Sequence, residues 1–165
     1  MFDFWLDTNS FVTPYRGAYR FETVPKFWEF LEDKSKDQII VSSEMVLQEL
    51  EKGKQGQEKP DSLLLWAAKQ DKLFLPLSSE VQEAYKTIAD SVKNNKQYKM
   101  YHVHEFLDEA DPWVIAHAKA FGGRVVTFEK NETNSTKPKI PDVADKFDIK
   151  CICIWDMLSE LHAVF

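Results

Sequence analysis

Four acidic residues in this 165-residue chain stand where folding could bring them together, namely Asp7, Glu49, Asp111 and Glu129. Carboxylates about 4–5 Å apart repel by roughly 3–4 kcal/mol per pair at an effective dielectric of about 20. A cluster of them therefore needs a compensating cation. All-oxygen carboxylate ligands favour Mg²⁺ or Mn²⁺ over Zn²⁺, which prefers nitrogen and sulfur. The four acids predict a divalent-metal site if the fold unites them.

The elements that would position these acids alternate between helical patterns and short apolar runs. Strands are predicted over 2–7, 39–41, 124–128 and 150–154, with loops over 53–60 and 129–140. Helices are predicted over 14–20, 25–34, 61–70, 80–93 and 141–147, from Ser42–Ser43 to Gly53, from Asp111 to Gly122–Gly123, and over a last stretch with Trp155, Leu158, Leu161 and His162. Because the strands are β-branched and aliphatic without clean alternation, we expect one α/β domain over 1–165. Its fold would be a three-layer α/β/α arrangement with a central, mainly parallel sheet.

The acids occupy corresponding places relative to these elements. Asp7 and Glu129 end the first and third strands. Glu49 lies on the helix after the second strand, and Asp111 begins the helix before the third. Ligands of an open parallel sheet bind outside the carboxyl ends of its strands. We therefore expect all four carboxylates to point into one cleft at that edge.

Each acid taken alone has a simpler structural explanation. Asp7 could form an Asx turn that caps the next helix, and Glu49 could pair with Lys52 on a solvated face. Asp111 could be only a helix cap, and Glu129 could be an ordinary loop acid. It is the joint order of the four, rather than any one of them, that favours a shared site.

The charge of the chain at first argues against a nucleic-acid partner. Lys and Arg total 21 and Asp and Glu total 27, so the net charge is −6, whereas phosphate binding relies on basic residues. The basic residues nevertheless gather in separate stretches, Lys93, Lys96 and Lys99 before an acidic segment and Lys130, Lys137 and Lys139 after it. An acidic total can therefore hide basic patches.

The sequence gives no sign of a membrane span or of export. Its apolar runs are far shorter than the ~20 residues of a spanning helix, and its first residues carry two acids and no basic segment. We expect a cytoplasmic protein with no membrane partner. Cys151 and Cys153 are too few for a disulfide framework, and we expect them to be reduced core residues.

Four segments occur in an order that resembles the PIN-domain family of metal-dependent nucleases, which includes the VapC-like ribonuclease toxins of prokaryotic toxin–antitoxin modules. The segments are Leu6-Asp7-Thr8-Asn9, Val46-Leu47-Gln48-Glu49-Leu50, Asp111-Pro112-Trp113-Val114-Ile115-Ala116-His117-Ala118 and Val125-Val126-Thr127-Phe128-Glu129. The resemblance spans nearly the whole chain. It is closest to a branch of small prokaryotic PIN-like proteins with Asp-Thr-Asn-Ser near the start and Lys139-Ile140-Pro141 before the last strand.

The resemblance implies that the four acids hold Mg²⁺ or Mn²⁺ and that the chain hydrolyses RNA to 5′-phosphate and 3′-hydroxyl ends. Glu129 would support the principal ion, a second ion or the attacking water. Three neighbours, Thr8, Asn9 and Thr127, would orient carboxylates and water through hydrogen bonds. A cognate antitoxin and a homodimer are further implications. Two departures are a fourth acid that is Glu rather than the more usual Asp, and Asp108 as a rival ligand before Asp111.

Two other classes of function are open from the residues alone. A catalytically inactive PIN-like module would act by binding a protein or RNA partner, although the presence of all four acids disfavours it. A phosphotransfer domain would also end a parallel strand in Asp. The haloacid-dehalogenase type needs Asp in place of Asn9, and the receiver type needs a phosphorylatable Asp after a central strand, which the 39–41 region lacks.

Other conspicuous residues carry weaker predictions. His102 and His104 resemble a metal pair but have no third ligand at a suitable spacing, and His117 is expected to pack within its helix. Most of the five Trp residues, at positions 5, 28, 66, 113 and 155, are expected in the core. On the predicted helix 14–20, two i,i+4 pairs could contact RNA or form a solvated face, and they comprise Tyr15, Arg16, Tyr19 and Arg20.

Overall fold

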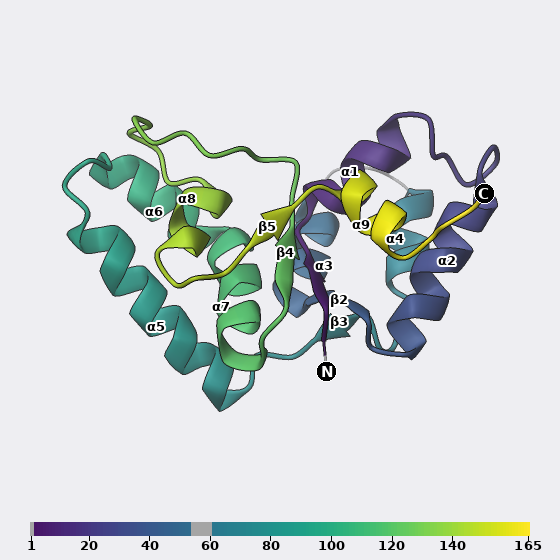
Figure 1. The fold of residues 1–165 in the computed structure, drawn as a ribbon, viewed down its shortest axis with the longest axis horizontal. Helices are drawn as coiled ribbons and strands as arrows, with labels where there is room; N and C mark the ends of the chain where they lie inside the picture. Colours follow the sequence, from purple (N-terminus) through teal and green to yellow (C-terminus); the bar gives the residue numbers. More distant parts are fainter. Residues whose placement is uncertain (1, 54–60) are drawn as a thin grey trace.

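The computed structural model describes residues 2–53 and 61–165, which form a three-layer α/β/α fold around a five-stranded, all-parallel sheet (Figure 1). The strands are β1 (Phe4–Leu6), β2 (Ile40–Ser43), β3 (Phe74–Leu75), β4 (Arg124–Val126) and β5 (Cys151–Ile152). They stand in the order β3-β2-β1-β4-β5, so β1 is central. The predicted fold class is confirmed.

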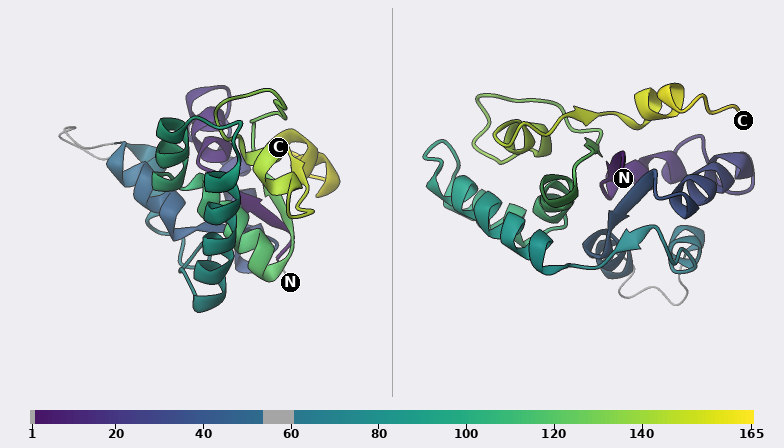
Figure 2. Two further views of the ribbon diagram at one scale, coloured as in Figure 1. Left: turned by 90° about the vertical axis from the view of Figure 1, so that its left-hand side faces the viewer. Right: turned by 60° about the horizontal axis from the view of Figure 1, so that its bottom comes forward.

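Helices cover both faces of the sheet. They are α1 (Asn9–Arg16), α2 (Pro25–Lys36), α3 (Glu44–Lys52), α4 (Ser62–Ala67), α5 (Ser79–Asn94), α6 (Met100–Asp108), α7 (Asp111–Phe121), α8 (Ile140–Asp145) and α9 (Ile154–Glu160). Figures 1 and 2 show α5 to α8 on one side of the sheet and α1, α2, α4 and α9 on the other. Helix α7 packs against β1, β2 and β4, and α5 packs behind it. These contacts bury both faces of the central strands, as a parallel sheet requires.

The strand order reverses beside β1. The chain passes from β1 to β2 and β3 and then returns to the other side of β1 to form β4 and β5. Leu6 is in register with Val126, and the next amide along, Asp7 N–H, donates to the Val126 carbonyl at 3.1 Å. The carboxyl ends of β1 and β4 therefore meet at the switch point, which is where open α/β sheets bind ligands.

The core is built around Trp5, which has no exposed surface. Its indole N–H donates to the Gly122 carbonyl at 2.8 Å, and its ring stacks on the buried His117 ring at 4.7 Å. His117 is thus a packed helix residue, as expected. The prediction for the Trp residues is confirmed at positions 5, 28 and 66, whereas Trp113 is half-buried and Trp155 is 41% exposed.

Several predicted element boundaries were wrong. The first helix begins at Asn9 and ends at Gly17, whose N–H donates to the Thr13 and Pro14 carbonyls. It begins early because the Asp7 carboxylate accepts a hydrogen bond from the Ser10 N–H. Helix α5 begins at Ser79, one residue before its predicted start, because the Ser78 hydroxyl caps it by accepting a hydrogen bond from the Val81 N–H. Three of the four predicted strands are shorter than expected, because only two or three residues of β1, β4 and β5 pair within the sheet. Strand β2 instead begins one residue later than predicted and continues to Ser43.

The sequence pattern did not predict two elements of the fold. Strand β3 has two residues and exists through its pairing with β2, so it has no periodicity of its own. Helix α6 buries only Val103 and Phe106, so its apolar stripe is too narrow to be recognised in the sequence. The predicted loop 53–60 lies, apart from Gly53, outside the described residues.

The two cysteines lie at the edge of the core rather than within it. Cys151 and Cys153 are free, as expected, but both are only half-buried, so their assignment to the core was wrong. Strand β5 ends at Ile152, which leaves Cys153 to begin α9. Every helix in the described part of the chain is too short or too polar to cross a bilayer.

The burial of His117 predicts how stability depends on pH. Burial lowers the pKa of His117 to about 4, so below its usual value of 6.5 the unfolded chain takes up a proton that the folded chain refuses. His117 therefore contributes stability that is complete above about pH 6.5 and is lost as the pH falls toward 4. We expect His117→Leu to remove this loss.

Urea unfolding of both proteins between pH 7 and pH 4 measures the effect. From pH 7 to pH 4, the free energy of unfolding of the wild type should fall by roughly 2–3 kcal/mol more than that of the variant. Ser43 Oγ, which lies 3.2 Å from His117 Nε2, keeps its hydrogen bond from the Met45 N–H in the variant. A difference that stays constant with pH would contradict the prediction.

Candidate functional site

Asp7 is a buried carboxylate at the carboxyl end of β1, with 2% of its surface exposed. Its Oδ1 accepts hydrogen bonds from the Ser10 N–H at 2.8 Å and the Ser10 hydroxyl at 2.7 Å, and its Oδ2 accepts one from the Thr127 hydroxyl at 2.7 Å. Burial raises the pKa of Asp7 to about 6, although these hydrogen bonds oppose the rise. Asp7 therefore accepts a hydrogen bond from the first turn of α1, as the Asx-turn explanation expects, and also lies at the switch point.

Glu49 reaches from α3 toward the beginnings of two other helices. Its Oε1 accepts a hydrogen bond from the Ala110 N–H at 2.7 Å, and its Oε2 accepts one from the Thr8 hydroxyl. Glu49 is thus held at the pocket rather than on a solvated face with Lys52. Thr8 orients this carboxylate, as the resemblance implied.

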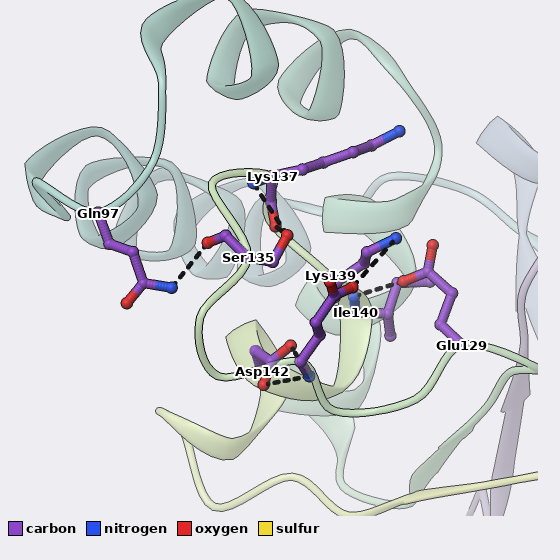
Figure 3. Close-up of polar contacts among 8 residues, drawn as sticks. Gln97, Glu129, Ser135, Lys137, Lys139, Ile140 and Asp142 are labelled. Atoms are coloured by element: carbon purple, nitrogen blue, oxygen red, sulfur yellow. Dashed lines mark hydrogen bonds and ion pairs between the residues drawn. The ribbon is translucent and has the colours of Figure 1, made fainter.

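Glu129 follows β4 and is held from two sides. Its Oε2 accepts a hydrogen bond from the Ile140 N–H at 2.7 Å, at the first residue of α8, and its own N–H donates to the Thr127 hydroxyl at 3.1 Å (Figure 3). Thr127 therefore touches both Asp7 and the Glu129 backbone. Its predicted role, orienting the carboxylates, agrees with these contacts.

Asp111 lies in the first turn of α7, and its prediction as the helix cap was wrong. The N-cap is Ala110, whose carbonyl already accepts hydrogen bonds from the Trp113 and Val114 N–H groups. Burial, and after it the negative charges of Glu129 and Asp7, raise the pKa of Asp111 well above its usual range. No donor among the described residues offsets this rise. Asp111 is the least compensated carboxylate of the four.

A pocket of about 510 Å³ unites these groups. Glu49, Asp111 and Glu129 line it together with Thr8 and Asn9, and Asp7 lies close enough for its charge to act on Asp111. Glu49, Asp111 and Glu129 thus meet at one pocket at the carboxyl edge of the sheet, whereas Asp7 lies outside its described lining. Tyr15 and Arg16 also line the pocket, whereas Arg20 and Asp108 are absent from its described lining.

The sequence left Asp108 open as a rival ligand, and it predicted a helix face with Tyr19 and Arg20 that was wrong. Asp108 is exposed at the end of α6 and is no rival to Asp111. Tyr19 and Arg20 lie beyond α1, because Gly17 ends the helix before them, and Tyr19 packs on Phe27 at 4.8 Å instead. The two i,i+4 pairs do not exist as a helix face.

Sequence reasoning did not place Glu109 or Lys137 in the site, although both line the pocket. Glu109, half-buried, turns inward where α6 ends, and burial followed by the charge of Glu49 raises its pKa. Lys137 reaches the pocket from the loop between β4 and α8. The sequence signals for them were the acidic run that contains Glu109 and the basic stretch that contains Lys137, but neither indicates which side chain turns inward.

The donor types in the pocket fit a hard divalent cation. All four acids offer carboxylate oxygens, each of which has two lone pairs, and at most two donors engage any one of these oxygens. In their present positions, no three His, Cys, Asp or Glu side chains of the described residues are close enough to hold an ion. Backbone N–H groups that donate to Glu49 and Glu129 hold these two carboxylates against the walls of the pocket.

The histidine pair on α6 offers no alternative metal centre. His102 is half-buried and its Nδ1 lies 3.6 Å from Glu105 Oε2, whereas His104 is exposed. No third ligand joins them among the described residues.

Comparison with known proteins gives one match. The matching family is described as a domain of unknown function, DUF4411, and it covers residues 4–165. The chain belongs to the DUF4411 family. No curated protein and no solved structure matches it. The matched range runs from β1 through α9, so every acid of the pocket lies within the DUF4411 domain.

The uncompensated charge of Asp111 predicts a stabilising substitution in this DUF4411 chain. Asn keeps the size of Asp111 and removes its charge, so Asp111→Asn should stabilise the chain at pH 7 with chelator by roughly 1 kcal/mol, or about 2–4 °C in Tm. Because the pKa of Asp111 is raised in the folded state, the contribution of Asp111 to wild-type stability becomes more favourable as the pH falls below 7. The advantage of the variant should therefore shrink at pH 5.

Thermal unfolding at pH 7 and pH 5 with EDTA measures this advantage. Asp108→Asn is the matched control, since Asp108 is exposed and outside the described pocket lining, and it should leave Tm within about 1 °C. A lower Tm for Asp111→Asn at pH 7 would show that its charge does not oppose folding.

Proposed function

We propose that this DUF4411 chain is a divalent-metal-dependent ribonuclease of PIN-like type that hydrolyses RNA phosphodiester bonds in the cytoplasm as the toxin of a prokaryotic toxin–antitoxin module. The observation that carries the proposal is a pocket at the switch point that Glu49, Asp111 and Glu129 line together, with the charge of the buried Asp7 acting on Asp111. Burying like charges in this way costs stability, and such costs are concentrated at functional sites. A cognate antitoxin and a homodimer belong to the same proposal.

The mechanism follows from the roles of these side chains. Bound Mg²⁺ or Mn²⁺ would supply an activated water and would neutralise charge on the phosphate during in-line displacement. Asp7, Glu49 and Asp111 would hold the ion, with Glu129 beside them. The hydrogen bonds that Asp7 accepts from Ser10 and Thr127 fix the direction of its oxygens before any ligand arrives.

Residues of α1 supply candidate RNA contacts at the side of the pocket. Tyr15 is half-buried there and Arg16 is exposed, so an aromatic face and a guanidinium stand next to the carboxylates. Such pairs bind bases and phosphates in single-stranded nucleic acid. Arg20 does not line the pocket, so we leave it out of the proposed RNA contacts.

Metal binding should raise thermal stability. A cation that binds only the folded chain stabilises it by about 2.7 kcal/mol at a concentration a hundred times its Kd, so Mg²⁺ or Mn²⁺ should raise Tm by several degrees. Asp7→Asn should reduce this shift by at least about half, because one ligand charge is lost. Asp108→Asn should preserve it. An equal shift in the Asp7 variant and in the wild type would place the ion elsewhere.

RNA cleavage tests the activity itself. Purified wild type should degrade total cellular RNA with Mn²⁺ and lose this activity with chelator, and Asp111→Asn should slow cleavage by about 100-fold or more. RNA binding should persist in the variant, because one negative charge fewer lowers repulsion of phosphate. Expression of the wild type should slow growth and expression of the variant should not.

The same assay separates enzyme from binding module. Cleavage that resists chelator would indicate chemistry without a metal or a contaminating nuclease, and equal activity of the two proteins would exclude Asp111 as a ligand. A wild type that binds RNA but cuts it with neither metal would replace the ribonuclease proposal with an inactive PIN-like binding module.

A further inference from the structure

The charge of the pocket poses a problem for an anionic substrate. Its described lining contains the acids Glu49, Asp61, Glu109, Asp111 and Glu129 and the bases Arg16, Lys52 and Lys137. The acids outnumber the bases, so an RNA phosphate is repelled unless cations stand where it enters. The position of each base in the pocket therefore decides where the strand can lie.

Lys137 is the base on the β4–α8 side of the pocket. It is half-buried, and its charge acts on Glu109 across the pocket. In the described part of the chain no carboxylate lies within 4 Å of its Nζ, and Figure 3 shows its side chain extended away from the loop that carries it. Lys139, two residues on, behaves differently, because its Nζ lies 4.0 Å from Glu132 Oε2. Lys137 is thus directed to the pocket without being neutralised by an ion pair.

The loop that carries Lys137 is fixed by Gln97. The Gln97 side-chain amide donates to the Thr133 carbonyl at 2.7 Å. It also donates to the Ser135 carbonyl at 2.7 Å (Figure 3). Ser135 in turn accepts a hydrogen bond from the Lys137 N–H at 3.0 Å and donates its hydroxyl to the Lys137 carbonyl at 2.8 Å.

A backbone hydrogen bond also holds the Lys137 loop to the start of α6. The Lys99 N–H donates to the Thr136 carbonyl at 3.0 Å, next to Lys137. A polar loop of this length would ordinarily be mobile. These bonds hold its backbone in one conformation, so the Lys137 side chain starts from a fixed point and loses less freedom on binding a ligand.

We propose that Lys137 binds a phosphate of the RNA strand in the pocket and that Gln97 is a positioning residue that holds the Lys137 loop. The proposal rests on the proposed ribonuclease function and names a substrate contact that its metal ligands do not supply. Lys suits this task because its ammonium is a compact point charge for phosphate. A purely structural Lys137 would instead neutralise Glu109 and have no effect on the salt dependence of RNA binding.

The test compares variants of Lys137 with the wild type, with a fluorescent single-stranded RNA as probe. Lys137→Gln should raise KM about 10-fold at 0.1 M salt and change kcat by less than about twofold. In an Asp111→Asn background, which prevents cleavage, Lys137→Gln should raise Kd similarly and reduce the slope of log Kd against log salt by about 0.7, the value for one phosphate contact on a single strand. Lys137→Arg should restore both quantities.

Two further variants separate position from charge. Gln97→Ala should raise KM about threefold alone and cause no further rise when combined with Lys137→Gln, because both act through the same contact. Lys139→Gln removes an equal charge from the same loop and should behave as wild type. Melting temperatures of all variants identify any loss of folding.

Each outcome decides between the two proposals. If Lys137→Gln and Lys139→Gln alter KM equally, or if the salt slope stays unchanged, the Lys137 proposal is overturned while wild-type cleavage sustains the ribonuclease. If the chain binds RNA with a slope that depends on Lys137 but never cuts it, the ribonuclease proposal falls and the phosphate contact stands. If the wild type binds no RNA, both proposals fail.

Discussion

A carboxylate buried at the end of the central strand is the constraint on which the rest of the site depends. Asp7 is nearly inaccessible to water, and an ionised carboxylate in such a place needs hydrogen bonds to replace its hydration. Ser10 and Thr127 supply them, so α1 must begin directly after β1 and the end of β4 must lie beside it. The register of β1 with β4 and the early start of α1 both follow from satisfying this one group.

The other acids join parts of the chain that are distant in sequence. Glu49 connects α3 to the start of α7 through the Ala110 N–H, and Glu129 connects the end of β4 to the start of α8 through the Ile140 N–H. A structural role and a place in the pocket are therefore compatible for each acid. The hydrogen bonds that Glu49 and Glu129 accept therefore do not take either side chain out of the pocket that the proposed metal would occupy.

The predictable part of this molecule is the part with a local signal. Buried strands are continuous apolar runs, so the parallel sheet and the acids that follow β1 and β4 could be read directly. Helix α6 and strand β3 could not, because their stability comes from contacts with other elements. The inward turns of Glu109 and Lys137 depend on where α6 ends and on the bonds from Gln97, which are tertiary facts with no local pattern.

Three helices begin at the acidic pocket, and each donates a backbone N–H to one carboxylate. Asp7 accepts from Ser10 in α1, Glu49 from Ala110 before α7, and Glu129 from Ile140 in α8. A negative charge at a helix N-terminus gains typically about 0.3–1 kcal/mol. Two charges about 8 Å apart repel by about 2 kcal/mol at an effective dielectric of about 20.

The helix starts therefore offset only part of the repulsion. The repulsion that remains acts on Asp111. Burial and the charges of four other carboxylates raise its pKa, and no hydrogen bond from the described residues opposes this rise. Moving Asp111 to the surface would remove the cost, as at Asp108 three residues earlier, which is exposed. A fold that holds this charge inward despite its cost supports the proposal that a cation binds in the pocket, and that balance of magnitudes is the physical argument for the proposed metal-dependent activity.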